Sequence, residues 1–172
     1  MRIPFFSAPS KPEVPANVDP CLEALTLGWI RDPDLVRNLL SDDAFFCFRS
    51  LDNELLLALG QREFELLLTS TNAGDGRSTI AMILASLSAV YSSDLSVLYV
   101  DASDDFRHSQ RLFNTPPERP GLYDYLEGTA EINQVLHATP LNNLQVVTCS
   151  AAKEGRRLFN PKRFEHFLVE SR

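Results

Sequence analysis

The chain has 172 residues, of which 44% are hydrophobic and 23% are charged, and its formal net charge is −7. These values are ordinary for a soluble globular domain with an extension. The acidic balance and the lack of a basic cluster argue against a nucleic-acid surface. No apolar stretch reaches the roughly 18 residues of a membrane-spanning helix, and the start of the chain is a poor signal peptide, so we expect a cytoplasmic location.

The first part of the chain divides at its prolines. Residues 1–20 hold prolines at positions 4, 9, 12, 15 and 20, which predicts a disordered, proline-rich arm. Residues 21–60 have helical apolar spacing and form a predicted helical extension. Asp32-Pro33 and Ser41-Asp42-Asp43 are typical helix starts within it. The last of these helices carries a phenylalanine-rich face with Phe45, Phe46 and Phe48, whose plainest interpretation is packing against the rest of the fold.

From residue 61 onward the hydrophobic period alternates between strand and helix, which predicts an α/β domain over residues 61–172. Strand followed by helix, repeated, indicates a mainly parallel sheet with helical crossovers. The expected strands are Phe64–Thr69, Ser96–Ala102 and Leu144–Thr148. The expected helices are Asp104–Phe113, Ser78–Tyr91, Leu122–Glu127, Glu131–His137 and a last one that begins at Asn160-Pro161.

The segment LLLTSTNAGDGRST, Leu66–Thr79, has the layout of a phosphate-binding loop: an apolar strand, a glycine-bearing loop and a helix start. Its chemistry departs from the Walker A pattern G-x-x-x-x-G-K-S/T, because Thr71 replaces the first glycine and Arg77 replaces the lysine. Arginine is longer and planar, so it would misplace a phosphoryl group. The residues predicted to contact phosphate are Gly74, Asp75, Gly76, Arg77, Ser78 and Thr79.

Asp101 is the candidate catalytic and metal-binding acid. It ends the second expected strand, and the carboxyl ends of parallel strands form the ligand-binding edge of such a sheet. Together with Ser78 it would hold Mg²⁺. Asp104 and Asp105 follow closely and are better explained as acids of a helix start. The alternative for the whole segment is a capped strand–helix turn that binds nothing. The three cysteines and three histidines are scattered and predict no zinc site.

Several motifs in order resemble the bacterial tyrosine kinases of polysaccharide synthesis and export, relatives of the MinD/ParA P-loop ATPases. Thr69–Thr79 is similar to their T-S-x-x-P-G-E-G-K-S-T, and Leu98–Ala102 to their L-L-I-D-A-D. Residues 111–128 are similar to R-L-F followed by P-G-L-x-D-x-L-x-G, and Asn143-Leu144 fits P-N-L. Phe48-Arg49-Ser50-Leu51 is similar to the E-A-F-R-S-L-R helix through which such kinases self-associate, with Phe46, Phe48 and Arg49 as its interaction residues.

The resemblance implies a three-layer, P-loop NTPase-like α/β fold that is incomplete relative to the family. Arg77, Ser103 and Asp52 depart from the motifs, and no second apolar run ending in aspartate follows the last helix as a Walker B strand. Such a strand would be an inner one, so we expect an open sheet edge. ATP and Mg²⁺ binding stays open, whereas we expect little or no kinase activity.

Three functions follow as hypotheses. The first is a catalytically degenerate kinase-like domain that assists or regulates exopolysaccharide or capsule synthesis and export. Its partner would be a membrane polysaccharide co-polymerase or a cognate kinase, which would also bring it to the membrane. The alternative is an active ATP-dependent tyrosine autokinase or ATPase of that pathway. The third is a relative of the MinD/ParA positioning ATPases.

Overall fold

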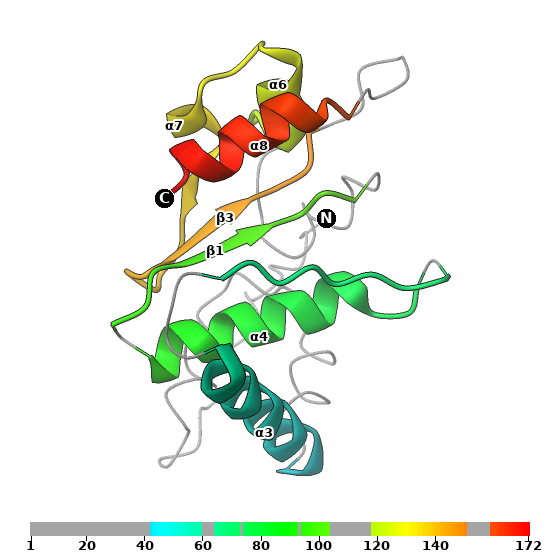
Figure 1. Cartoon of the computed structure of the whole chain (residues 1–172), viewed down its shortest axis with the longest axis vertical. Coiled ribbons are helices and arrows are strands. Elements are labelled where there is room, and N and C mark those ends of the chain that lie inside the picture. The colour runs from blue at the N-terminus through cyan, green and yellow to red at the C-terminus, as the bar shows by residue number, and fades with distance from the viewer. Residues whose placement is uncertain (1–41, 60–63, 73, 93, 104–117, 151–158) are drawn as a thin grey trace, which may run out of the picture.

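The computed structural model of the chain describes residues 42–59, 64–72, 74–92, 94–103, 118–150 and 159–172. In chain order the elements of these ranges are α3 (Asp42–Leu59), α4 (Arg77–Tyr91), β1 (Val97–Val100), α6 (Leu122–Glu127), α7 (Ile132–Val135), β2 (His137–Ala138), β3 (Leu144–Val147) and α8 (Pro161–Glu170) (Figure 1). No helix in the described part is long and apolar enough to cross a membrane.

The strands of the described residues form a three-stranded mixed sheet in the order β1-β3-β2. β1 and β3 are parallel, with Val97 opposite Leu144 and Val100 opposite Val147. This confirms the parallel pairing predicted for these two segments. β2 pairs antiparallel with β3 and begins at His137, the last residue of a predicted helix. A two-residue strand depends on its neighbour across the sheet, so local helical spacing does not reveal it.

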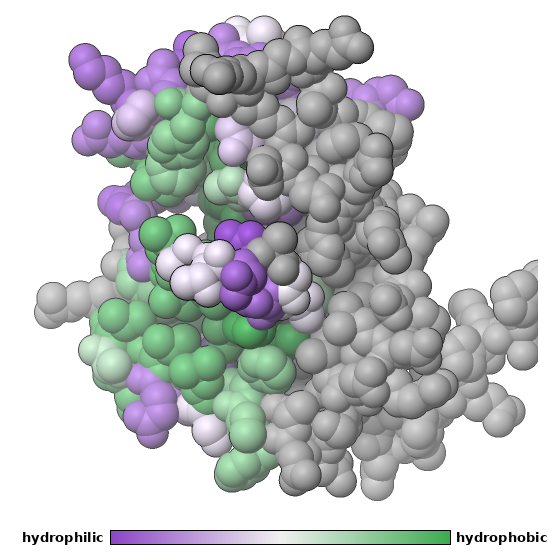
Figure 2. Space-filling model, turned by 90° about the vertical axis from the view of Figure 1, so that its right-hand side faces the viewer, coloured by the Kyte–Doolittle hydropathy of each residue, from purple (hydrophilic) through white to green (hydrophobic). Residues whose placement is uncertain are grey.

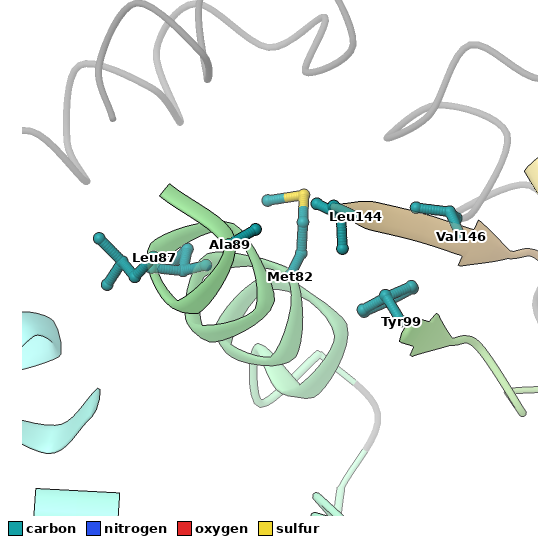
Figure 3. Packing of buried hydrophobic residues seen from close by; sticks show 7 residues of the cluster. Met82, Leu87, Ala89, Tyr99, Leu144 and Val146 are labelled. Atoms are coloured by element: carbon teal, nitrogen blue, oxygen red, sulfur yellow. The ribbon is translucent and has the colours of Figure 1, made fainter. Parts of the chain in front are cut away.

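Helices cover both faces of this sheet. Figure 1 shows α3 and α4 on one side and α6, α7 and α8 on the other. Successive side chains of a strand point to opposite faces, so β1 contributes Val97 and Tyr99 to one apolar cluster and Leu98 and Val100 to the other. The α4 side is closed by Met82, Leu87, Ala89, Leu144 and Val146, drawn with Tyr99 in Figure 3. The opposite side is built around Leu122, Tyr125, Leu126, Val135, Val147 and Phe167.

The predicted strand Phe64–Thr69 is the main departure. The segment has no strand pairing in the described part of the chain and runs as an extended trace (Figure 1). Its side chains are mostly exposed, with Leu67 at 87% and Leu66 at 46%. An extended apolar segment becomes a strand only when a neighbouring strand takes up its backbone hydrogen bonds, and none of the described strands does so.

The helix predictions agree better with the structure. α4 begins at Arg77, one residue before the predicted start, and α6 has the predicted bounds. α8 begins after Asn160, whose side chain accepts a hydrogen bond from the Arg163 N–H at 3.2 Å. An asparagine cap followed by proline at the first turn is a strong local start signal.

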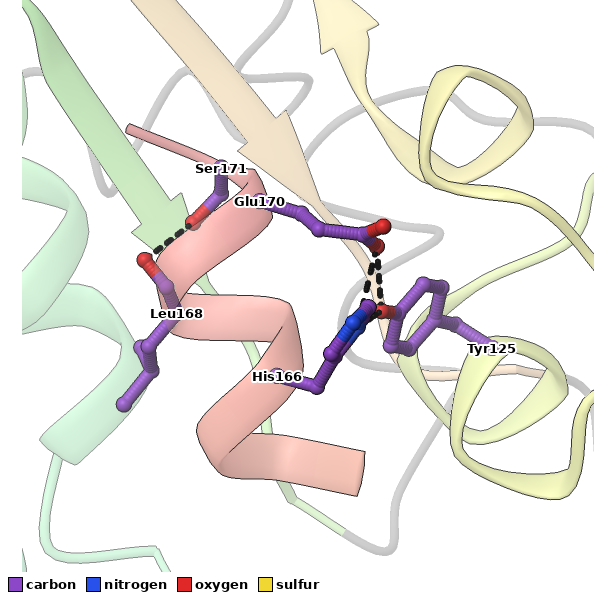
Figure 4. Close-up of polar contacts among 5 residues, drawn as sticks. All are labelled: Tyr125, His166, Leu168, Glu170 and Ser171. Atoms are coloured by element: carbon purple, nitrogen blue, oxygen red, sulfur yellow. Dashed lines mark hydrogen bonds and ion pairs between the residues drawn. The ribbon is translucent and has the colours of Figure 1, made fainter. Parts of the chain in front are cut away.

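α8 is fixed to α6 by a polar contact as well as by apolar packing. The Tyr125 hydroxyl donates a hydrogen bond to Glu170 at 2.5 Å and lies 2.9 Å from Nδ1 of His166 (Figure 4). Burial, followed by this bond and the charge of Glu170, raises the pKa of Tyr125 to about 12. The proline-rich arm 1–20, the helices predicted within 21–40 and the short helix Asp104–Phe113 lie outside the described residues.

Candidate functional site

Two glycines shape the loop that leads into α4. φ is +89° at Gly74 and +83° at Gly76, a left-handed conformation that residues with a Cβ rarely adopt. Between them, the Asp75 carboxylate accepts a hydrogen bond from the Asn72 backbone N–H at 3.1 Å. A phosphate in this loop would therefore compete with Asp75 for at least one backbone donor.

The first turn of α4 contains Arg77, Ser78 and Thr79. No acidic residue lies in this turn, and no side chain caps it. The first N–H groups of a helix have no intrahelical acceptor and carry partial positive charge, so this end suits an anion. Arg77 is exposed and forms no ion pair with another described residue. Its guanidinium therefore has no ion-pair partner among these residues.

Asp101 lies where the sequence predicted it, directly after β1. Its backbone N–H donates to the Val147 carbonyl at 2.8 Å, which continues the β1–β3 ladder by one bond. Its side chain is 4% exposed, and Oδ1 accepts a hydrogen bond from the Ser103 N–H at 2.9 Å. The carboxylate thus has a structural role in shaping the turn after β1.

A buried tyrosine connects this acid to the start of α4. The hydroxyl of Tyr99 is hydrogen-bonded by the Ser78 side chain, and Asp101 and Cys149 lie close enough to act on it electrostatically. Burial is the main cause that raises the pKa of Tyr99, and the charge of Asp101 adds to it. Tyr99 therefore stays a neutral hydroxyl. The two predicted Mg²⁺ ligands, Ser78 and Asp101, therefore both lie near the Tyr99 hydroxyl.

The neighbouring strand ends in a buried polar stretch that sequence reasoning missed. Thr148, Cys149 and Ser150 are all at most 4% exposed. The Ser150 hydroxyl accepts a hydrogen bond from the Asp124 N–H at 3.0 Å, and Leu122 N–H donates to the Thr148 carbonyl at 2.9 Å. These bonds place the start of α6 beside the candidate site. In the sequence, only the motif P-G-L-x-D pointed to this contact, because its glycine allows the start of α6 to lie close to the end of β3.

The three residues predicted for interaction divide between two faces of α3. Phe48 packs on the α4 side of the core, and the Arg49 guanidinium lies 3.4 Å from the centre of the Tyr91 ring. Both therefore fasten α3 to α4. Phe46, in contrast, is 72% exposed, and Leu57 on the same helix is 76% exposed.

Asp52 stands where the self-association motif that this helix resembles has arginine, and its contacts explain what it does instead. It is 2% exposed and accepts a hydrogen bond from the Ser88 hydroxyl of α4 at 2.5 Å. Its other oxygen lies 3.7 Å from Arg49. An arginine does not fit this buried position beside Arg49, so α3 is committed here to packing within its own chain.

The donors in the described residues suit a phosphate better than a metal ion. The open N–H groups of α4 and the exposed Arg77 are both complementary to negative charge. No group of three or more His, Cys, Asp or Glu side chains converges within the described ranges. A Mg²⁺ ion would depend on Ser78 and Asp101, with water or phosphate oxygens as its remaining ligands. Asp104 and Asp105 lie outside the described residues.

No family model matches the chain, and no curated protein or solved structure is significantly similar to it.

Proposed function

We propose that this chain is a catalytically degenerate domain related to the bacterial tyrosine kinases, and that it assists or regulates exopolysaccharide or capsule synthesis and export through protein contacts. The observation that carries the proposal is Arg77. It lies at the first position of α4, where a P-loop enzyme has lysine, and it is exposed.

Phosphoryl transfer depends on where a positive charge is placed relative to the phosphates. Lysine offers a compact ammonium that reaches between two phosphates, whereas the guanidinium of Arg77 is planar and extends further. Phosphoryl transfer depends almost entirely on positioning and charge, and a displacement of about 1 Å can cost ~100-fold in rate. Asp101 is also engaged by the Ser103 N–H. The guanidinium of Arg77 and the hydrogen bond on Asp101 would each impair catalysis while leaving the fold intact.

If catalysis is lost, the function depends on surface side chains that contact a partner protein. Phe46 and Leu57 present large apolar side chains on α3 without a partner in the described part of the chain. Burial of such side chains stabilises a complex by roughly 25 cal/mol per Å² of apolar area before association costs. A membrane polysaccharide co-polymerase or an active kinase of the same pathway would supply the partner surface, and the domain would act at the cytoplasmic face.

The test is complementation of a deletion strain, with secreted polysaccharide as the readout. Arg77→Ala should restore polymer to the wild-type level, whereas Phe46→Asp should not. Val169→Asp is the matched control, because Val169 is also exposed, at 65%, but lies on α8. If Arg77→Ala abolished polymer output while the protein stayed folded, nucleotide chemistry would be required and the scaffold role would be wrong.

One observation favours a second candidate, an ATP-dependent autokinase or ATPase. Ser78, in the uncapped first turn of α4, and Asp101, directly after β1, both lie near the Tyr99 hydroxyl. This is where an enzyme would need its metal and phosphates. Incubation with labelled Mg-ATP separates the two candidates. Phosphotyrosine or released phosphate that disappears in Asp101→Asn would establish the enzyme and refute the degenerate domain.

A further inference from the structure

His137 is a buried polar side chain at the edge of the sheet. It begins β2, lies opposite Val146 of β3 and is 6% exposed. The Arg119 guanidinium lies 3.4 Å from its Nδ1. Because a guanidinium only donates hydrogen bonds, Nδ1 is the acceptor, and the neutral ring carries its proton on Nε2. Nε2 is buried and has no hydrogen-bond partner in the described part of the chain.

A second proton on the ring would make this buried position unfavourable. The proton would go to Nδ1, which could then no longer accept from Arg119, and two positive charges would face each other. The charged ring would also be buried away from water, which is costly for an ion without a partner of opposite charge. Burial first, and Arg119 second, lower the pKa of His137, and the Pro120 carbonyl offsets them only in part. A protonated ring is therefore more stable in water than beside β3.

The described surroundings of His137 offer no negative charge to compensate for Arg119. β3 presents Val146 opposite the ring, and all four residues of α7, which directly precedes β2, are uncharged. The acidic residues in the neighbouring described segments do not raise the pKa of the ring; they are Glu118, Asp124, Glu127 and Glu131. The charge state of His137 thus depends on Arg119 and on the access of water to the ring.

β2 is the part of the sheet that can open at the lowest cost. It has two residues and pairs only with β3 among the described strands. β1 and β3, in contrast, pair over four residues between two apolar clusters. A local opening costs less free energy than unfolding when it breaks few buried contacts. Exposure of the charged ring therefore requires only that β2 leaves β3, and the rest of the sheet can stay paired.

We propose that His137 and Arg119 form a pH-sensitive latch that holds β2 on the edge of the sheet. At neutral pH the neutral ring accepts the hydrogen bond from Arg119, and β2 stays paired with β3. When His137 takes up a proton from solvent, the Arg119 contact is lost, β2 separates from β3 and the ring reaches water. Acidification thus uncovers one edge of β3 while β1 and β3 stay paired. The latch depends neither on the proposed scaffold role nor on nucleotide binding.

Amide exchange followed by NMR on the full chain, at low concentrations of urea, tests the latch. The amides of His137 and Val146 report on the β2–β3 pairing. The amides of Val97 and Asp101, whose hydrogen bonds to the β3 segment are 2.8 Å long, report on the β1–β3 pairing. Exchange is compared at about pH 7.5 and about pH 5.5, on either side of the ordinary histidine pKa, after correction for the intrinsic exchange rate.

The equilibrium constant for the opening of β2 should be about tenfold larger at the lower pH, because an exposed histidine is mostly protonated there. This opening should depend only weakly on urea, since it exposes little surface, whereas the β1–β3 amides should show the steep urea dependence of global unfolding. If the β2–β3 amides had the same opening free energy and urea dependence as the β1–β3 amides at both pH values, β2 would open only on global unfolding and the latch would be wrong.

Variants at two exposed arginines locate the effect. Arg119→Gln keeps a neutral donor but removes the charge beside the ring, so the pKa of His137 in an NMR titration should rise toward its ordinary 6.5 and the effect of pH on opening should shrink. The matched control is Arg172→Gln, because Arg172 is also exposed but pairs with Glu65. Equal effects of the two variants would overturn the latch.

Replacement of the histidine itself gives the second test. In His137→Gln, the opening reported by the Val146 amide should no longer depend on pH, and a pH dependence equal to that of the wild type would overturn the latch. If this buried substitution prevents folding, the comparison of Arg119→Gln with Arg172→Gln decides alone.

Association of the chain at low pH is the rival explanation of a change in exchange. The isoelectric point is about 4.9, so the net charge becomes small near pH 5.5, and a small net charge promotes association. Figure 2 shows hydrophobic side chains gathered on one face of the molecule, where such contacts could form. The exchange is therefore measured at two protein concentrations about tenfold apart. Opening of β2 that is the same at both concentrations supports the latch, whereas a pH effect that appears only at the higher concentration refutes it.

Discussion

Replacement of Gly121 by alanine should destabilise the protein strongly, although φ at this glycine is ordinary. A Cβ at this position would lie 2.3 Å from the Thr148 carbonyl oxygen and 2.8 Å from backbone atoms of Cys149 and Ser150. All three contacts are with backbone at the end of β3, which has little room to move. The clash costs about 1–3 kcal/mol, and loss of the Leu122–Thr148 hydrogen bond adds about 1 kcal/mol.

The matched control is Gly74→Ala. Gly74 has a φ of +89°, but a Cβ there would meet nothing within 4 Å. Only the left-handed conformation is penalised, at roughly 1–2 kcal/mol. Urea unfolding followed by far-UV circular dichroism measures both variants, and a loss of about 3 kcal/mol would shift the midpoint by ~1–3 M. A larger loss in Gly74→Ala, or near-wild-type stability of Gly121→Ala, would refute the close approach of α6 to β3.

Three further predictions follow from buried polar groups. Burial and Arg119 hold the pKa of His137 below its ordinary 6.5. The free energy of unfolding should therefore fall as pH drops below about 6.5, and it should fall less in His137→Leu. Urea unfolding at each pH measures both proteins. Tyr125→Phe removes the bond to Glu170 and should cost about 1 kcal/mol at neutral pH. Because the pKa of Tyr125 is raised, that difference should shrink in unfolding experiments as pH rises from about 10 toward 12. Asp52→Ala leaves the partly buried Ser88 hydroxyl of α4 without its acceptor and should lower the calorimetric Tm, with a loss of ~1–3 kcal/mol.

The parts of the fold that local sequence specifies were predictable. α4 and α8 have helical apolar spacing, and Asn160-Pro161 supplies the N-cap and first turn of α8. Phe64–Thr69 was predicted as a strand for an equally local reason, its apolar composition. Composition cannot show whether a neighbouring strand is present, and here none of the described strands pairs with it. The P-loop NTPase-like fold stays a prediction, because a small mixed sheet with helices on both faces is compatible with other folds.

The candidate site shows the same division between local and distant information. The placement of Asp101 follows from a general rule about the ends of parallel strands. The contact of Tyr99 with Ser78 and the position of Ser150 depend on elements far apart in the sequence. Asn143 is a further case: it was noted only as part of a motif. Its side chain donates to the carbonyls of Ala89 and Leu95, at 2.8 and 3.0 Å, and so joins the end of α4 to the start of β1.

The contacts of the candidate site residues also decide which of them can tell an enzyme from a scaffold. Asp101 shapes the turn after β1, and Ser78 holds the Tyr99 hydroxyl. Both side chains have a structural contact whether or not a nucleotide binds, so their presence does not distinguish an enzyme from a scaffold. Arg77 is different, because it is exposed and its side chain has no hydrogen bond or ion pair with another described residue. No contact of the fold requires a particular side chain at position 77, so only phosphate chemistry in the loop would require a lysine there. The absence of that lysine supports the degenerate domain.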